Sequence, residues 1–136
     1  MTLNQVAHRV LAVALSAGSA GAMLCIGLYH SRIVERMWCP LNGKGCEAVA
    51  DAPFARPFGL PDGYIGAVLY AIMLGLLFVP PRERWAWLAL LVLGVLAVAA
   101  NVIGVYDMAR LGSFCTYCLL ATAASPVLLW ALWHRR

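Results

Sequence analysis

The fold of this chain is decided by residues 63–106, which read GYIGAVLYAIMLGLLFVPPRERWAWLALLVLGVLAVAANVIGVY. Two apolar runs, residues 63–79 and 85–106, flank a short break that holds Pro80, Pro81 and three charged residues. A double proline stops a helix, and the charges resist burial in hydrocarbon. About 20 helical residues span the roughly 30 Å hydrocarbon core of a bilayer. The stretch therefore predicts two antiparallel membrane-spanning helices joined by a tight hairpin.

Two further apolar runs, residues 10–29 and 114–133, lie on either side of this hairpin and bring the predicted spans to four. A short connection joins the third run to the fourth, with Gly112 for the turn and Ser113 as a suitable N-cap. We therefore expect an all-α fold, an integral membrane four-helix bundle that forms a single domain over residues 1–136. An even number of spans places both termini on the same side of the membrane.

The composition excludes an ordinary water-soluble protein. Of the 136 residues, 63% are hydrophobic and only 12% are charged, which leaves too little polar surface to cover a soluble core. The net charge of +4 is modest, and the basic residues are scattered as topology signals beside a membrane usually are. We therefore expect membrane lipid around the chain and no nucleic-acid partner.

The first apolar run has an alternative interpretation as a signal peptide. Arg9 precedes the run, and the small residues 18–22 resemble a cleavage site. The apolar run nevertheless continues through residues 23–29, which is long for the apolar core of a signal peptide and suits a membrane span. We therefore count it as the first span.

The connection between the first and second spans, residues 30–62, is longer than packing requires. Loops of that length are usually functional. Within it, residues 47–51 predict about one helical turn, which Pro53 would end. Phe54 and Phe58 are then expected on the membrane surface, as a cap over the helix mouths.

Four of the five cysteines form two pairs on one predicted side of the membrane. Cys39 and Cys46 lie in the long loop, where Asn42-Gly43 favours a turn that brings them to the roughly 5.5 Å Cα separation of a disulfide. Cys115 and Cys118 open the last apolar run. A pair interconverts between dithiol and disulfide with little backbone movement, and a second pair within reach can pass electrons on by thiolate attack. The two pairs therefore predict an electron relay.

With Ser113 as N-cap, Cys115 and Cys118 are expected in the first turns of the last helix, on neighbouring positions of one face. The amide groups and the positive dipole end there favour thiolate over thiol. Cys118, one turn deeper, would meet a substrate dissolved in the bilayer, and Cys115 would meet the loop. Cys25, in the middle of the first span, is expected to be a small packing residue.

Other uses of the four cysteines remain open from their spacing alone. They could form purely structural disulfides, or a four-cysteine zinc site, although six residues separate the first pair where zinc knuckles have two. A membrane protein that handles a soft metal ion through its thiolates is the alternative from another functional class.

The orientation in the membrane follows from charge and from cysteine chemistry together. Five basic residues lie on the side of the termini and five on the other side, so their number alone does not orient the chain. Those on the terminal side stand in very short segments beside helix ends, where the positive-inside rule acts most strongly. Disulfides persist outside the cytoplasm. We therefore expect both termini in the cytoplasm and the cysteines outside.

The cysteine pattern, together with Phe58-Gly59 twelve residues after Cys46 and the later Gly66 and Tyr70, resembles the vitamin K epoxide reductase family. That family has a four-helix membrane fold and includes bacterial disulfide-forming oxidases. The resemblance runs over nearly the whole chain. It implies that Cys118 is the cysteine that reacts with a quinone and that Cys115 is the resolving cysteine.

The resemblance further implies that Cys115 exchanges with Cys46, and that Cys39 meets an external thiol partner. Three positions depart from the family pattern. Ala52 stands where a serine or threonine is usual, Thr122 replaces a tyrosine, and Asp62 falls on the substrate-facing asparagine of the animal enzymes. These departures concern the quinone pocket, and they leave the thiol relay intact.

The sequence thus predicts a multi-pass thiol:quinone oxidoreductase of the inner (plasma) membrane. It would oxidise a thioredoxin-like extracytoplasmic protein, pass the electrons to a quinone of the ubiquinone or menaquinone type, and support disulfide bond formation. The predicted quinone pocket lies near the start of the last helix. Its expected lining includes Phe58 and Tyr70, and Asp62 or Thr122 would bond a quinone oxygen; Asp62 can donate only when protonated, which burial favours. The alternative substrate is a vitamin K-like epoxide.

Overall fold

The structure, a computed structural model, describes residues 2–36, 39, 43–80 and 82–134. Most of these residues are helical and none is in a strand, as predicted. They form four long helices, α1 (Leu3–His30), α3 (Asp62–Leu77), α4 (Arg84–Leu111) and α5 (Thr116–His134). A fifth helix, α2 (Gly45–Ala50), lies in the loop between α1 and α3, followed by the 3₁₀ turns η1 (Pro53–Ala55) and η2 (Pro57–Gly59). The turn expected in this loop is thus a short helix, which adds a fifth α-helix to the predicted four.

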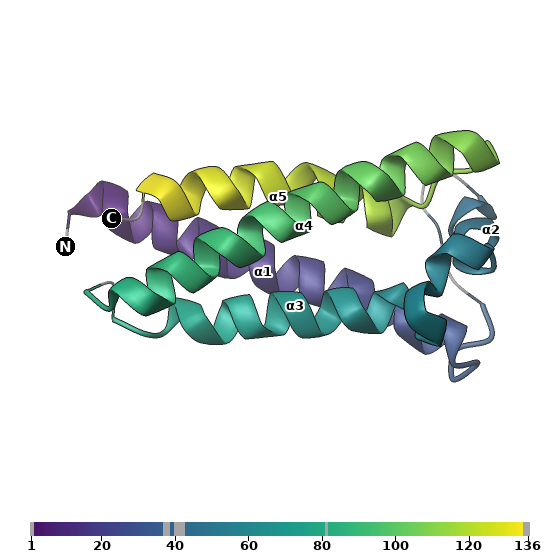
Figure 1. The fold of residues 1–136 in the computed structure, drawn as a ribbon, viewed down its shortest axis with the longest axis horizontal. Helices are drawn as coiled ribbons and strands as arrows, with labels where there is room; N and C mark the ends of the chain where they lie inside the picture. The colour runs from purple at the N-terminus through teal and green to yellow at the C-terminus, as the bar shows by residue number, and fades with distance from the viewer. Residues whose placement is uncertain (1, 37–38, 40–42, 81, 135–136) are drawn as a thin grey trace.

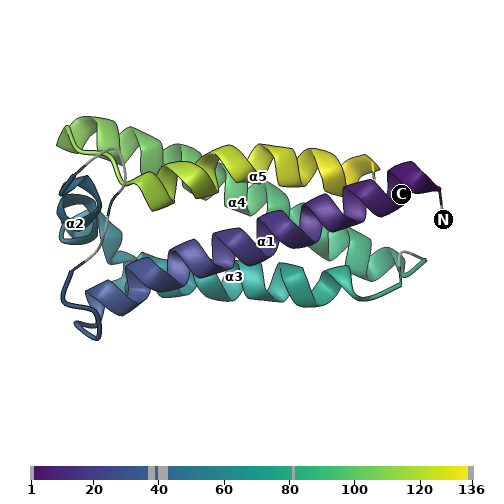
Figure 2. The ribbon, with the colours of Figure 1, turned by 180° about the vertical axis from the view of Figure 1, so that it is seen from behind.

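The four long helices lie side by side (Figures 1 and 2). Helix α1 packs against α3 and α5, and α4 packs against α5 and α3. Both termini lie at one end of the bundle, whereas α2 and the start of α5 lie at the other end (Figure 1). The two cysteine pairs therefore belong to the same end.

Two helices are longer than the sequence predicted. Helix α1 begins at Leu3, because the Thr2 side chain accepts a hydrogen bond from the backbone N–H of Gln5 and the Gln5 side chain accepts one from the backbone N–H of Thr2. Helix α4 continues beyond the expected residue 106, and Gly112 ends it in the left-handed conformation at φ 78°. The predicted connection between α4 and α5 is shorter as a result.

Helix α5 begins later than predicted, at Thr116, so Ser113 is not its N-cap. The backbone carbonyl of Cys115 accepts the bond from the Leu119 N–H at 2.9 Å, which makes Cys115 the residue just before the first turn. Pro126 lies inside this helix and has no N–H for the Thr122 carbonyl.

Three helices, α1, α4 and α5, are long and apolar enough to cross a membrane, and α3 is a shorter apolar helix of 16 residues. The outward faces of these helices carry large apolar side chains, such as Val92, Val102 and Ile103, each more than half exposed. Lipid is the solvent that suits such a surface. Cys25, expected to be a small packing residue, lies on this exposed surface of the bundle.

Close packing of α1 and α3 positions the site. A Cβ added at Gly63 would lie 2.6 Å from the backbone oxygen of Met23 in α1. Only glycine therefore lets the two backbones approach so closely. Further along the bundle, α1, α3, α4 and α5 share a buried core that includes Ala12, Met73, Leu90 and Leu128.

Candidate redox and quinone site

The loop cysteines, Cys39 and Cys46, form a disulfide with a Cα separation of 5.7 Å. This confirms that the loop folds back as predicted, while the expected turn at Asn42 lies outside the described residues. Cys46 stands in the first turn of α2 and is fully buried, and Cys39 is only 5% exposed. The disulfide is therefore buried inside the protein.

The second pair is present as free thiols at the start of α5. Cys115 is buried, and Cys118 is half-buried one turn along the helix. Cys115 lies in the connection before α5. Its thiol accepts a hydrogen bond from the Cys118 side chain and further bonds from the backbone N–H groups of Cys118 and Tyr117. These bonds lower the pKa of the Cys115 thiol, although burial acts in the opposite direction. In the reduced pair, negative charge is thus stabilised on Cys115.

Thr116 brings the two pairs together. Its backbone N–H donates to Cys46 Sγ at 3.3 Å, and its hydroxyl oxygen lies 3.4 Å from Cys39 Sγ. Cys115, the neighbour of Thr116, belongs to the same buried cluster as both loop cysteines. The structure thus places the loop disulfide directly against the start of α5.

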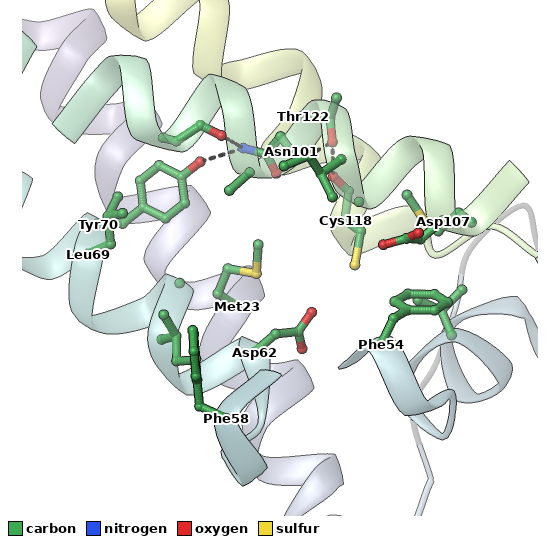
Figure 3. Close-up of a pocket in the computed structure, with 18 residues that line it drawn as sticks. Met23, Phe54, Phe58, Asp62, Leu69, Tyr70, Asn101, Asp107, Cys118 and Thr122 are labelled. Carbon is green, nitrogen blue, oxygen red and sulfur yellow. Dashed lines mark hydrogen bonds between the residues drawn. The ribbon is translucent and has the colours of Figure 1, made fainter. Parts of the chain in front are cut away.

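A pocket of about 530 Å³ lies beside the second pair, and Cys118 lines it (Figure 3). Its walls come mainly from apolar side chains of α3 and α4, with Met23 of α1 and Phe54 of the loop. All four side chains that the sequence predicted for a quinone pocket line it: Phe58, Asp62, Tyr70 and Thr122. The structure brings these residues together, and their roles toward a quinone remain predictions.

The Asp62 carboxyl group points into this pocket, and its Oδ1 atom is buried without a hydrogen-bond partner among the described residues. The Thr122 hydroxyl, in contrast, already donates to the Cys118 carbonyl at 2.7 Å. Phe58 borders the pocket beside Asp62, although it is 98% exposed and its backbone adopts the left-handed region at φ 59°. Of the two side chains predicted to bond a quinone oxygen, Asp62 is therefore the one whose carboxyl group has an oxygen without a hydrogen-bond partner among the described residues.

Sequence reasoning missed two polar residues of the pocket, Asn101 and Asp107. Both stand on α4, and Figure 3 shows the Asp107 carboxyl group on the opposite side of the pocket from Asp62. Polar side chains within a membrane helix usually mark a functional site. Asn101 interrupts an otherwise apolar run in the sequence, and this signal alone could have identified it.

A comparison with known protein families tests the resemblance found in the sequence. The model of the vitamin K epoxide reductase family matches residues 10–133, which is nearly the whole chain. This protein belongs to the vitamin K epoxide reductase family. Members of the vitamin K epoxide reductase family are membrane-embedded thiol-disulfide and quinone oxidoreductases, which agrees with the apolar helices and the cysteine pairs.

The metal-site alternative receives no geometric support from the described part of the chain. There, no three His, Cys, Asp or Glu side chains come together in a way that could hold a metal ion. The loop sulfurs are joined to each other, and disulfide sulfurs do not offer the thiolates that a soft metal ion binds.

Proposed function

We propose that this protein is a thiol:quinone oxidase of the inner membrane that supports disulfide bond formation. It oxidises a thioredoxin-like extracytoplasmic partner and reduces a quinone of the ubiquinone or menaquinone type. In the membrane, the termini lie in the cytoplasm and the end of the bundle with the cysteine pairs faces outward.

The observation that carries this proposal is the arrangement in series of one disulfide, one dithiol and one apolar pocket. The Cys39–Cys46 disulfide lies against Thr116, next to Cys115. Cys118 then borders the pocket. Each group of the relay is thus adjacent to the next. Direct attack of a thiolate on a disulfide requires such proximity.

The electrons follow this order. The partner dithiol attacks the loop disulfide at Cys39, leaves as a disulfide, and converts the loop pair to two thiols. Cys46 thiolate then attacks the Cys115–Cys118 disulfide at Cys115, and Cys39 displaces Cys115 to restore the loop disulfide. The last pair is now a dithiol, and its two electrons and two protons pass to the quinone substrate, which becomes the quinol.

In this scheme, the stage after the internal exchange has a disulfide in the loop and a dithiol at α5, and the disulfide between Cys39 and Cys46 and the free thiols of Cys115 and Cys118 support it. The pocket suits the head group of a quinone because its walls are largely apolar while polar atoms stand at its two ends. Asp62, when protonated, would donate to a quinone oxygen beside Cys118. Replacing Asp62 with leucine should slow quinone reduction and leave the exchange between the cysteine pairs unchanged, whereas asparagine should retain much of the activity.

The test is an assay of purified full-length protein with a reduced thioredoxin-like protein and a soluble short-chain quinone, followed by quinone absorbance. We expect partner-dependent quinone reduction. With Cys39→Ala, reduction driven by the partner should be lost, while reduction driven by dithiothreitol persists because the small thiol can reach the last pair. Equal loss with both reductants would contradict the relay. A vitamin K epoxide, supplied in place of the quinone, tests the alternative substrate.

A further inference from the structure

Asn101 forms a hydrogen-bonded contact between helices at the depth of the pocket. It stands on α4, a helix apolar enough to cross the membrane, where an unsatisfied amide is costly. Its Nδ2 group donates to the Ala97 carbonyl at 2.8 Å and to the Tyr70 hydroxyl of α3 at 3.1 Å. The two N–H bonds of this amide are therefore both used.

This geometry determines the direction of the Tyr70 hydroxyl. Because the oxygen accepts from Asn101, the hydroxyl proton must point elsewhere, and we find no acceptor for it among the described residues. The Tyr70 ring is 2% exposed, so its packing holds the hydroxyl in place. Both residues line the pocket, and Figure 3 shows them at the end away from Phe54. The pocket thus contains an oriented donor at this inner end.

The other side of the Asn101 amide faces the helix that carries Cys118. The Thr122 hydroxyl lies 3.5 Å from Asn101 Oδ1 and 2.7 Å from the Cys118 carbonyl, to which it donates. Ser125 Oγ donates to the Thr122 carbonyl at 3.1 Å, which replaces the bond that the following proline cannot make. Asn101 therefore connects Tyr70 to the turn of α5 on which Cys118 stands.

Polar atoms lie at two ends of a largely apolar pocket, with Tyr70 and Asn101 at one end and Asp62, Asp107 and Cys118 at the other (Figure 3). A 1,4-quinone has the same pattern, with two oxygen atoms on opposite sides of an apolar ring. On the basis of the proposed function, we infer that Asn101 is a positioning residue that holds the Tyr70 hydroxyl as the donor to the inner carbonyl oxygen of the quinone. In this chain, a phenol from α3 thus supplies the donor.

The competing explanation is that Asn101 only links the helices, as polar side chains often do in membrane bundles. The two explanations differ in what happens to a bound quinone. A purely structural link would change the stability of the bundle and leave the hydrogen bond to the carbonyl unchanged. A positioning residue would act on that bond through Tyr70, and its effect would vanish once the phenol is gone.

The experiment measures quinone binding by the full-length protein in a Cys118→Ala background, where no turnover occurs. The variants are Tyr70→Phe, Asn101→Leu and their combination, with Ser16→Ala as the control because Ser16 is buried in α1 outside the pocket. We expect each single variant to weaken binding by about 3- to 10-fold, the value of one hydrogen bond. The double variant should bind no more weakly than Tyr70→Phe, and the control should bind as the parent does.

Infrared spectroscopy of the bound quinone provides the second readout. One carbonyl stretching band should move to higher frequency in Tyr70→Phe and in Asn101→Leu, because the oxygen loses its donor. Additive losses of affinity, or an unchanged band in either variant, would overturn the inference. Tyr70→Phe removes one oxygen atom and preserves the packing, so it provides the test even if Asn101→Leu does not fold. A wild-type protein that reduces no quinone would refute the proposed function. If the wild type reduces quinone normally and the variants bind it with unchanged affinity, only this inference is refuted.

Discussion

The hydrogen bond from the Thr116 backbone to Cys46 provides the sharpest test of the relay. Thr116 is the first residue of α5, where proline is well accepted because that N–H has no partner within the helix. Thr116→Pro therefore removes the donor to Cys46 Sγ while preserving the helix start. Thr116→Ala is the matched control, since it keeps the N–H and removes only the hydroxyl beside Cys39.

The size of the effect follows from the charge on Cys46 during the exchange. A hydrogen bond to a charged group contributes about 1.5–3 kcal/mol, so its loss lowers the thiolate population of Cys46 by roughly 10- to 100-fold. The thiolate that remains is intrinsically more reactive, which recovers about 40–50% of this loss on a logarithmic scale. We therefore expect the exchange between the two pairs to slow by roughly 3- to 15-fold in Thr116→Pro.

The assay is a single turnover. The loop pair is reduced rapidly while the α5 pair is a disulfide, and acid quenching followed by alkylation reports the redox state of each pair with time. Thermal unfolding of each variant in detergent checks that the fold is retained. The reasoning fails if Thr116→Pro exchanges as fast as the wild type, or if Thr116→Ala accounts for the whole decrease in rate, because Cys46 would then not be the attacking thiolate that the N–H stabilises.

Three further predictions concern topology, the order of exchange and helix packing. A membrane-impermeant thiol reagent applied to intact cells after reduction should label both loop cysteines; labelling only after the cytoplasm is opened would reverse the orientation. In Cys118→Ala, Cys115 should be trapped in a mixed disulfide with Cys46, which non-reducing peptide mapping detects, and a Cys46–Cys118 disulfide in the unmodified chain would contradict the order of exchange. Gly63→Ala should lower stability by about 1–3 kcal/mol because its Cβ meets the α1 backbone. Gly75→Ala, which has open space around its Cβ, should not; equal melting temperatures would show that α1 and α3 can separate without penalty.

The sequence alone determined the all-helical class, the membrane setting and the cysteine pairs. Each depends on local properties: the length of an apolar run, a double proline, or two cysteines with a glycine turn between them. Local reasoning failed where a helix end depends on packing. Helix α4 continues past the predicted end because Met108 is buried beside the cysteine cluster. Ser113 is a good N-cap by residue type, yet the chain turns into α5 only at Thr116.

The tertiary structure decided which groups meet. Nothing in the residues around Thr116 indicates that its N–H donates to a sulfur 70 positions earlier in the chain. Asn101 is visible in the sequence as a polar residue in an apolar run, but its bond to Tyr70 depends on the packing of α3 against α4. Such contacts join residues that are distant along the chain, and the energy that selects them comes from the packing of whole helices. The sequence therefore identified the reacting thiols, whereas the folded bundle determined their neighbours and the pocket beside them.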